Sequence, residues 1–220
     1  MLPSLNEEKA IKKVIKEINL VPLQKKEILV IDGGSTDATT TIARQLGTKV
    51  IIEAKRGYST AVLKGINHAK GQIIVIMDSD YTYPSQYIPQ LIKPILKNKA
   101  DIVLGNRLTN ANLKSMKASH FFGNKILNII FNFLYHSKIQ DTQTGFRAVR
   151  KKIFKKMKIR SKGIFLPTEI IIQAIKLRLK IKEKVIIYRP RIGRSKLSPL
   201  RDGFIILLKM IINRISYFKK

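Results

Sequence analysis

The first half of the chain alternates short apolar runs with longer stretches that have helical spacing. The runs are rich in Ile, Leu and Val, which is typical of buried strands, and the stretches between them place apolar residues on one helical face. The predicted strands are residues 27–32, 49–53, 73–77 and 101–105, and the predicted helices are 7–18, 36–46, a stretch ending near 69, and 86–97. This alternation favours βαβ units, so we predict an α/β fold with a mostly parallel sheet flanked by helices.

Two apolar stretches in the second half, residues 121–135 and 204–218, are interrupted by polar residues. Asn124, Asn128 and Asn132 fall on one stripe of the first stretch, which predicts an amphipathic helix. No apolar run in the chain reaches the roughly 18 residues needed to span a bilayer. Each helix could pack on the core of the domain, or lie in a membrane interface with its apolar face in lipid. The pattern of 121–135 favours the membrane, whereas the C-terminal amphipathic helix fits both interpretations equally.

The most informative stretch is the strand at 73–77, which ends in two carboxylates one residue apart, Asp78 and Asp80. Alternate side chains of an extended segment point the same way, so both acids can converge on one point. Two like charges held that close repel each other unless a cation lies between them. Since ligands of open α/β sheets bind at the carboxyl ends of strands, the pair predicts a divalent metal that holds a phosphorylated substrate. An ordinary turn is the alternative.

Composition narrows the possible chemistry. The chain of 220 residues contains no cysteine, which excludes a disulfide scaffold, and its three scattered histidines, His68, His120 and His136, have no zinc-site spacing. The formal net charge of +29 would attract a polyanion: nucleic acid, an anionic membrane surface or a phosphorylated substrate. The same charge also fits a surface that is simply rich in lysine.

Three further segments carry polar residues at predicted strand or helix ends. Residues 32–37 (DGGSTD) follow a strand, and their glycines allow the backbone to approach a ligand that Asp32 contacts. Residues 55–61 (KRGYSTA) place a basic, glycine-containing loop at a helix N-terminus, which suits a phosphate. Residues 140–147 (QDTQTGFR) bring an acid, polar residues and an arginine into one irregular segment. Each segment alone has low specificity.

In their order and spacing, these segments resemble glycosyltransferase family 2, whose nucleotide-sugar-binding domain has the Rossmann-like GT-A fold. The matching segments are PSLNEE at 3–8, IDGGSTD at 31–37, KRGYSTAVLKGINHAKG at 55–71, MDSDYTYP at 77–84, GNR at 105–107 and QDTQTGFRAV at 140–149. Within the family, the chain is most similar to the dolichyl-phosphate mannose synthase and polyprenyl-phosphate glycosyltransferase branch. Residues 165–169 (FLPTE) and 188–196 (YRPRIGRSK) extend that similarity.

The resemblance implies roles for individual residues. The nucleotide-sugar pocket would be formed by Pro3, Asn6, Glu7, Asp32, Lys55, Gly57 and Asp78. Asp78 and Asp80 would hold Mg²⁺ or Mn²⁺ on the donor diphosphate. The acceptor phosphate would be bound by Arg107, Lys117, Arg191, Arg194 and Lys196. Asp141 would lie beside the reacting sugar, so that the catalytic residues would be Asp80, Asp141 and Arg107.

The resemblance also implies a reaction and a place for it. A metal-dependent hexosyltransferase would move a sugar, with inversion, from a nucleotide-diphosphate sugar to a polyprenyl (dolichyl) phosphate. It would work as a peripheral protein at the cytoplasmic face of the cell membrane, bound to an anionic lipid surface. If the acceptor were a sugar hydroxyl instead, a base would be required, and Asp141 is the candidate. More distant alternatives are a nucleotidyltransferase and a basic nucleic-acid-binding protein, although no nucleic acid is expected as a partner because no nucleic-acid-binding motif is present.

We expect a GT-A domain over residues 1–197, followed by the amphipathic, membrane-associated helix over 198–220. The family normally has an apolar strand before PSLNEE, and here only Met1 and Leu2 precede it, so we expect most of the first strand to be missing. This favours a start upstream of Met1 or a fragment. Thr82 stands where mannose synthases commonly have Gln, which weakens mannose as the expected sugar.

Overall fold

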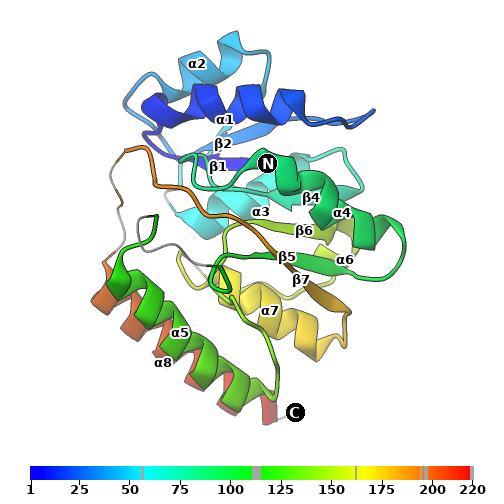
Figure 1. The fold of residues 1–220 in the computed structure, drawn as a ribbon, viewed down its shortest axis with the longest axis vertical. Helices are drawn as coiled ribbons and strands as arrows, with labels where there is room; N and C mark the ends of the chain where they lie inside the picture. The colour runs from blue at the N-terminus through cyan, green and yellow to red at the C-terminus, as the bar shows by residue number, and fades with distance from the viewer. Residues whose placement is uncertain (56, 111–114, 162, 194, 196–197, 219–220) are drawn as a thin grey trace.

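The computed structural model describes residues 1–55, 57–110, 115–161, 163–193, 195 and 198–218 (Figure 1). The strands are β1 (Leu2–Ser4), β2 (Leu29–Asp32), β3 (Lys49–Ile52), β4 (Ile73–Ile76), β5 (Ile102–Asn106), β6 (Arg147–Arg150) and β7 (Ile181–Val185). The helices are α1 (Glu8–Leu20), α2 (Thr39–Gln45), α3 (Tyr58–His68), the 3₁₀ turn η1 (Ser85–Tyr87), α4 (Ile88–Leu96), α5 (Ala118–Tyr135), α6 (Lys151–Phe154), α7 (Leu166–Lys176) and α8 (Pro199–Phe218). The strands and helices predicted in the first half are confirmed, with boundaries shifted by a few residues.

The strands form two hydrogen-bonded groups, in the orders β1-β2-β3 and β4-β6-β5-β7. The Met1 amine donates to the Val75 carbonyl oxygen at 2.9 Å, and the Met77 amide donates to the Met1 carbonyl oxygen at 3.1 Å, so β1 lies against β4 and joins the groups. Strand β6 runs antiparallel to both β4 and β5, whereas the other paired strands are parallel. The predicted α/β fold with a mostly parallel sheet is therefore confirmed, and the antiparallel β6 is an addition to it.

The first strand is short but present. Leu2, Pro3 and Ser4 pair with Val30, Ile31 and Asp32 in parallel register. Against the expectation that most of this strand is missing, three residues of it occupy the position between β2 and β4. They direct the segment that follows to the carboxyl ends of both neighbouring strands.

Helices cover both faces of the sheet, and each face has its own apolar core. The core against α3, α5, α7 and α8 contains Val62, Phe131, Ile171 and Met210, and the core against α1 and α4 contains Ile11, Ile15 and Leu91. Successive residues of β5 alternate between them, because Ile102 and Leu104 belong to the first and Val103 to the second. Each fully buried Ile or Leu stabilises the fold by about 1.5–3 kcal/mol. The two cores fix the sheet and hence the positions of its strand ends.

Helix α5 has three different faces. Phe131 and Tyr135 are buried in the core, and the Tyr135 hydroxyl donates to the Met210 carbonyl oxygen of α8 at 2.8 Å. Two residues of the asparagine stripe bind the segment that follows α5, because Asn128 accepts a hydrogen bond from the Thr142 amide at 2.9 Å and Asn132 donates to the Ile139 carbonyl oxygen at 2.8 Å. The remaining face is apolar and exposed. Among the described helices, none combines the length and the apolar character that crossing a bilayer requires.

Candidate active site

A pocket of about 400 Å³ lies at the carboxyl ends of β1, β2 and β4. It is lined by Pro3, Ser4, Leu5, Glu7, Gly33, Gly57, Tyr58, Ala61, Asp78, Ser79, Asp80, Gln143, Gly145, Gly163, Ile164, Pro167 and Arg191. Several sequence-predicted residues meet here: Pro3, Glu7, Gly57, Asp78, Asp80 and Arg191. They come from segments that are as far as 188 positions apart in the chain, and the sheet brings their ends to one edge.

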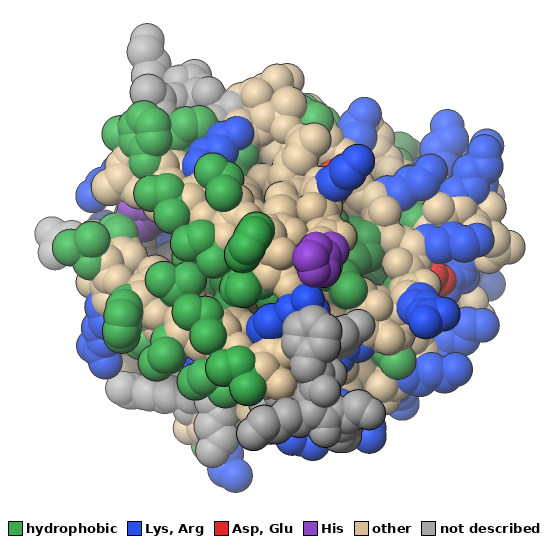
Figure 2. Space-filling view, turned by 90° about the horizontal axis from the view of Figure 1, so that it is seen from below, with side chains coloured by type: hydrophobic (Ala, Val, Ile, Leu, Met, Phe, Trp, Pro, Cys, Tyr) green, Lys and Arg blue, Asp and Glu red, His purple; other side chains and the backbone are tan. Residues whose placement is uncertain are grey.

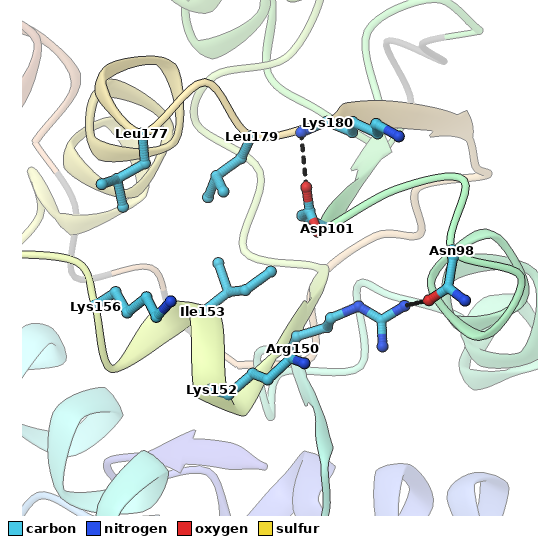
Figure 3. A pocket seen from close by; sticks show the side chains of 9 residues that line it. All are labelled: Asn98, Asp101, Arg150, Lys152, Ile153, Lys156, Leu177, Leu179 and Lys180. Atoms are coloured by element: carbon cyan, nitrogen blue, oxygen red, sulfur yellow. Dashed lines mark hydrogen bonds between the residues drawn. The ribbon is translucent and has the colours of Figure 1, made fainter.

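A second pocket, of about 510 Å³, lies at the opposite ends of the strands (Figure 3). It is found between Asp101, just before β5, and Arg150, at the end of β6. None of the described residues that line it is a predicted site residue. The smaller pocket is therefore the candidate active site.

Asp78 and Asp80 both line the candidate pocket, as the alternation of an extended segment predicts. Asp80 is 4% exposed; its Oδ1 accepts hydrogen bonds from the Thr82 amide at 3.1 Å and from the Thr82 hydroxyl at 2.6 Å. Burial, followed by the nearby charge of Asp80, raises the pKa of Asp78 to about 6. The two acids thus repel each other at neutral pH, and a cation between them would relieve that repulsion.

Arg191 supplies positive charge to this site from the other half of the chain. Its Nη1 donates to Asp80 Oδ2 at 2.7 Å, and its Nη2 donates to Glu7 Oε1. Glu7 is fixed in turn, because its backbone amide donates to the Thr39 hydroxyl at 2.8 Å. The guanidinium therefore joins the start of α1 to the acidic end of β4.

Gly145 is required for the close approach of two segments. A Cβ atom at this position would lie 2.4 Å from Asp78 Oδ2, well inside contact distance. The Gly145 amide donates to the Tyr83 hydroxyl at 2.8 Å, which holds the segment against the end of β4. The Thr-Gly-Phe sequence thus lets the 140–147 segment lie directly on Asp78.

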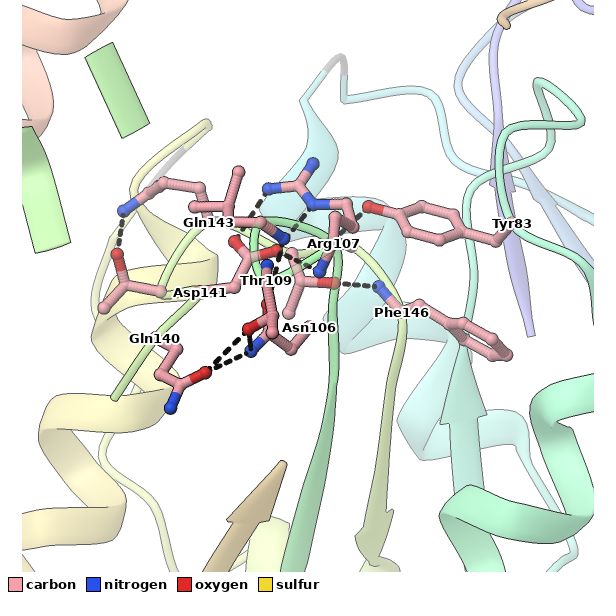
Figure 4. Close-up of polar contacts among 12 residues, drawn as sticks. Tyr83, Asn106, Arg107, Thr109, Gln140, Asp141, Gln143 and Phe146 are labelled. Atoms are coloured by element: carbon pink, nitrogen blue, oxygen red, sulfur yellow. Dashed lines mark hydrogen bonds and ion pairs between the residues drawn. The ribbon is translucent and has the colours of Figure 1, made fainter. Parts of the chain in front are cut away.

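Arg107 and Asp141 form a buried, two-pronged ion pair (Figure 4). The Arg107 Nε donates to Asp141 Oδ2 at 2.8 Å, its Nη2 donates to Oδ1 at 2.8 Å, and its backbone amide also donates to Oδ2 at 2.9 Å. Although burial alone would lower it, the charge of Asp141 raises the pKa of Arg107 above its usual value. The sequence-predicted acceptor residue and the sequence-predicted base therefore neutralise each other in this structure.

The loop that carries Asp141 is held from two sides. Glu183 of β7 accepts hydrogen bonds from the Gln140 amide at 2.9 Å and the Asp141 amide at 3.0 Å, and burial raises the pKa of Glu183. Asn106 of β5 donates to Gln140 Oε1 at 2.8 Å (Figure 4). With Asn128 of α5 on the other side, these contacts fix Asp141 beside β5.

Other predicted residues lie away from the lining of the pocket. Asn6 Oδ1 accepts from the Thr36 amide at 2.8 Å, and Asp32 Oδ2 accepts from the Gly34 and Ser35 amides at 2.9 Å each, so both side chains bind loop backbone. Lys55 and Lys117 are exposed at the ends of loops. Arg194 and Lys196 lie outside the described residues.

Sequence reasoning missed several residues that shape the pocket. Tyr58 lies inside the predicted phosphate loop at 55–61, and burial raises its pKa well above the usual value, with Asp78 nearby adding to the shift. Gln143 donates to the Thr168 hydroxyl at 2.8 Å and lines the pocket from the opposite side. Tyr58 and Gln143 both lie inside recognised motifs, so attention to the residues between the charged positions could have found both.

The acidic pair fits a hard divalent cation. Among the described residues, no cluster of three or more acidic, histidine or cysteine side chains could hold a metal, so the protein itself offers two carboxylates. Mg²⁺ is commonly bound through one or two carboxylates plus substrate phosphates, and Mn²⁺ accepts the same oxygen ligands. Asp78 and Asp80 would hold such an ion, and a bound diphosphate would complete its coordination.

We predict that Asp78→Asn stabilises the protein in the absence of divalent metal. A pKa raised from 3.8 to about 6 means that the native state favours the neutral acid, so stability is lost as the pH rises through about 6. At pH 7.5 the variant should gain up to about 3 kcal/mol, since each pKa unit corresponds to about 1.4 kcal/mol. Well below pH 3.8, where the acid is protonated in both the native and the unfolded state, the difference should vanish. Thermal unfolding across this pH range measures it.

Asp37→Asn is the matched control and should change stability in the opposite direction. Burial alone would raise the pKa of Asp37, but hydrogen bonds from Thr39 and from the Glu8 amide lower it overall. Removing this carboxylate should therefore destabilise the protein at neutral pH. An Asp78→Asn variant that is less stable than wild type at pH 7.5 would contradict the account of the acidic pair.

We predict that Gly145→Ala weakens metal binding because the added methyl group must displace the Asp78 carboxylate. Changes that disturb the support of a metal ligand typically reduce affinity roughly 10- to 100-fold. Gly123→Ala, on α5, is the control, since a Cβ there meets no atom within 4 Å. Titration with Mn²⁺ should show weaker binding in the first variant only. Equal affinity in both would show that Gly145 does not position Asp78.

Residues 1–158 match the model of glycosyl transferase family 2. The low-salt glycan biosynthesis hexosyltransferase Agl6 of Haloferax volcanii is 32% identical over 99% of this chain and 54% of its own length. A dolichyl-phosphate hexose transferase of the same organism is 31% identical over 92% of this chain and 87% of its own. The chain thus spans about half the length of the first relative and most of the second.

Among solved structures, glucosyl-3-phosphoglycerate synthase from Mycobacterium tuberculosis, in complex with Mn²⁺, uridine diphosphate and phosphoglyceric acid, has a TM-score of 0.78. It is 21% identical and covers 97% of this chain and 76% of its own, so the likeness concerns the fold. It agrees with the GT-A architecture expected from the sequence motifs. By the family match over most of its length, the chain belongs to glycosyl transferase family 2.

Proposed function

We propose that the chain transfers a hexose from a nucleotide-diphosphate sugar to a polyprenyl (dolichyl) phosphate at a membrane surface. The observation that carries this proposal is the convergence of Asp78, Asp80 and Arg191 in one pocket at the strand ends. Membership of glycosyl transferase family 2 supports glycosyl transfer over the nucleotidyltransferase and nucleic-acid-binding alternatives. Similarity to a dolichyl-phosphate hexose transferase supports the lipid phosphate as acceptor.

In this reaction, an acceptor phosphate oxygen attacks the anomeric carbon, and the bond from that carbon to the donor diphosphate breaks. The electron pair leaves with the nucleoside diphosphate, where negative charge develops. Mg²⁺ or Mn²⁺ held by Asp78 and Asp80 would neutralise part of that charge. Arg191 lies within hydrogen-bond distance of Asp80, so its guanidinium is close enough to stabilise the same leaving group.

The state of Asp141 favours a phosphate acceptor over a sugar hydroxyl. A phosphate monoester has its second pKa near 6 and is already largely ionised at neutral pH, so it needs no strong base. A hydroxyl acceptor needs a base, and the Asp141 carboxylate is fully buried and occupied by Arg107. Arg107 would contribute its charge to the acceptor phosphate from this fixed position, and Lys117 is a further candidate for the same role.

The surface formed by α5 and α8 supports action at a membrane. Its exposed apolar side chains are Phe122, Ile126, Ile129 and Phe133 on α5 and Leu200, Phe204, Leu208, Ile211, Ile212 and Ile215 on α8. Figure 2 shows apolar side chains gathered on one side of the molecule, with lysine and arginine gathered beside them. Large exposed apolar patches are uncommon on monomers, and basic residues beside them suit anionic headgroups. We propose that this α5–α8 face rests on the cytoplasmic membrane surface as a peripheral contact.

We predict that the purified protein releases nucleoside diphosphate in step with formation of a polyprenyl-phosphate sugar. A panel of nucleotide-diphosphate sugars would be tested with polyprenyl phosphate, with and without Mn²⁺ or Mg²⁺. Turnover should require the metal and should be lost in Asp80→Asn, because the amide is a poorer ligand for a hard cation. Metal-independent turnover, or none with any donor, would contradict the proposal.

The same assay applied to Asp141→Asn separates the two acceptor classes. With a phosphate acceptor the variant should be slowed, because Arg107 loses its partner, but it should still turn over. With a sugar hydroxyl as acceptor, loss of the only proposed base should abolish the reaction. Complete loss of transfer to polyprenyl phosphate would therefore count against the phosphate acceptor.

We predict that the double change Ile129→Glu and Phe133→Glu releases the protein from vesicles. These side chains are 68% and 79% exposed, so charges there should leave the fold intact and oppose burial in lipid. Leu96→Glu, at a 64% exposed apolar residue of α4, is the control. Flotation with vesicles that contain anionic lipid should retain wild type and Leu96→Glu, and high salt should weaken both.

Two outcomes would contradict the membrane contact. In the first, the double variant binds vesicles as well as wild type does. In the second, wild type does not bind vesicles but forms a dimer, and the double variant does not form that dimer. Sedimentation of the same samples without lipid distinguishes the second case.

A further inference from the structure

The segment that follows β7 crosses the acidic end of β4. We call residues 188–193 the strap. The Arg189 amide donates to the Thr82 carbonyl oxygen at 2.9 Å, and the Ile192 amide donates to the Asp80 carbonyl oxygen at 3.1 Å. Figure 1 shows this segment running from β7 back across the sheet towards β1. The strap therefore lies directly on the turn that presents the metal-binding acids.

Within the strap, Arg191 makes an incomplete set of contacts. Two of its nitrogens bind carboxylates, Asp80 on one side and Glu7 on the other. Its Nε is buried and, of all buried side-chain nitrogen and oxygen atoms in the described residues, is the one without a hydrogen-bond partner. A buried donor that has lost water without gaining an acceptor is uncommon. Arg191 is thus held here by charge, in an arrangement that does not satisfy its hydrogen bonding.

The contact with Asp80 lies where a metal would bind. Asp80 Oδ1 already accepts two hydrogen bonds from Thr82, so Oδ2 is the oxygen that faces a cation, and Arg191 Nη1 lies 2.7 Å from it. A divalent ion that approached this oxygen would meet the positive guanidinium at short range. Both cations neutralise the same acids, and their mutual repulsion disfavours binding of the two together.

We infer that Arg191 is the resident cation of the acidic site and competes with the divalent metal for Asp80. Metal entry detaches the guanidinium from Asp80 and loosens the strap. A donor diphosphate brings phosphate oxygens that a detached guanidinium can bind, so metal and diphosphate favour each other's binding. This inference rests on the metal site of the proposed function and adds to it the expectation that the metal binds more weakly without nucleotide than with it.

The test is Mn²⁺ binding in the absence of nucleotide, followed by electron paramagnetic resonance. Arg191→Gln should bind Mn²⁺ roughly tenfold more tightly than wild type, a coupling within the usual range. Arg191→Lys keeps the charge and should stay close to wild type. Arg189→Gln is the control, because it removes the same charge from the same strap. Arg189 pairs with Glu17 at 2.8 Å and lies over the Tyr81 ring, so the Mn²⁺ affinity of this variant should equal that of wild type.

Hydrogen exchange of the strap gives a second readout that does not depend on activity. In wild type, Mn²⁺ should speed exchange of the Arg189 and Ile192 amides, because the strap loses its side-chain contact with Asp80. In Arg191→Gln, exchange should already be fast and should not respond to Mn²⁺. Unchanged or slower exchange in wild type would contradict detachment.

The outcomes separate this inference from the proposed function. If wild type binds Mn²⁺ through Asp80 but Arg191→Gln binds no more tightly, the competition is wrong and the metal site stands. If Arg191→Gln and Arg189→Gln increase the Mn²⁺ affinity equally, the increase comes from the lower overall charge, and the competition is wrong. If neither wild type nor Arg191→Gln binds Mn²⁺, the metal site and the competition both fail.

Discussion

The structure depends on the balance of charge around carboxylates that the fold forces together. Asp78 and Asp80 lie on one strand end, Glu7 approaches from the start of α1, and burial strengthens their repulsion. The compensating cation in this structure is Arg191, whose side chain comes from beyond β7. The site therefore forms only when segments from both halves of the chain have folded onto the same sheet edge, and the negative charge that Arg191 leaves uncompensated would attract a metal.

The same principle explains the second charged centre. Arg107 and Asp141 are both buried, and their pairing offsets the free-energy cost of removing each charge from water. Either charge buried without its partner would destabilise the fold. The pair is held by Glu183 of β7 and Asn128 of α5, so the helix whose apolar face we propose rests on the membrane also supports the loop that carries Asp141. In the proposed function, membrane contact and acceptor binding would thereby be attached to one helix.

The sequence predicted those parts of the fold that depend on local pattern. The apolar run of β4 and the alternation of Asp78 and Asp80 follow from strand geometry, and both were confirmed in position. Strands β6 and β7 were not predicted, because β6 has an Arg at each end and β7 has three consecutive charged residues between Ile181 and Val185, as a half-exposed edge strand. Helical spacing places the three asparagines on one side of an amphipathic helix, but tertiary contacts hold Asn128 and Asn132 against residues 139–142. The pairing of Arg191 with Glu7, 184 residues away, is purely tertiary and no local pattern could have indicated it.

The most direct measurement of the central claim is a crystal structure of the protein with Mn²⁺ and a nucleoside diphosphate, with the metal located by its anomalous scattering. The account predicts a peak about 2.0–2.3 Å from a carboxylate oxygen of Asp80, close to Asp78, with the Arg191 guanidinium moved from Asp80 to a phosphate oxygen. A peak elsewhere in the molecule, or a bound diphosphate with no metal and Arg191 still paired with Asp80, would contradict it.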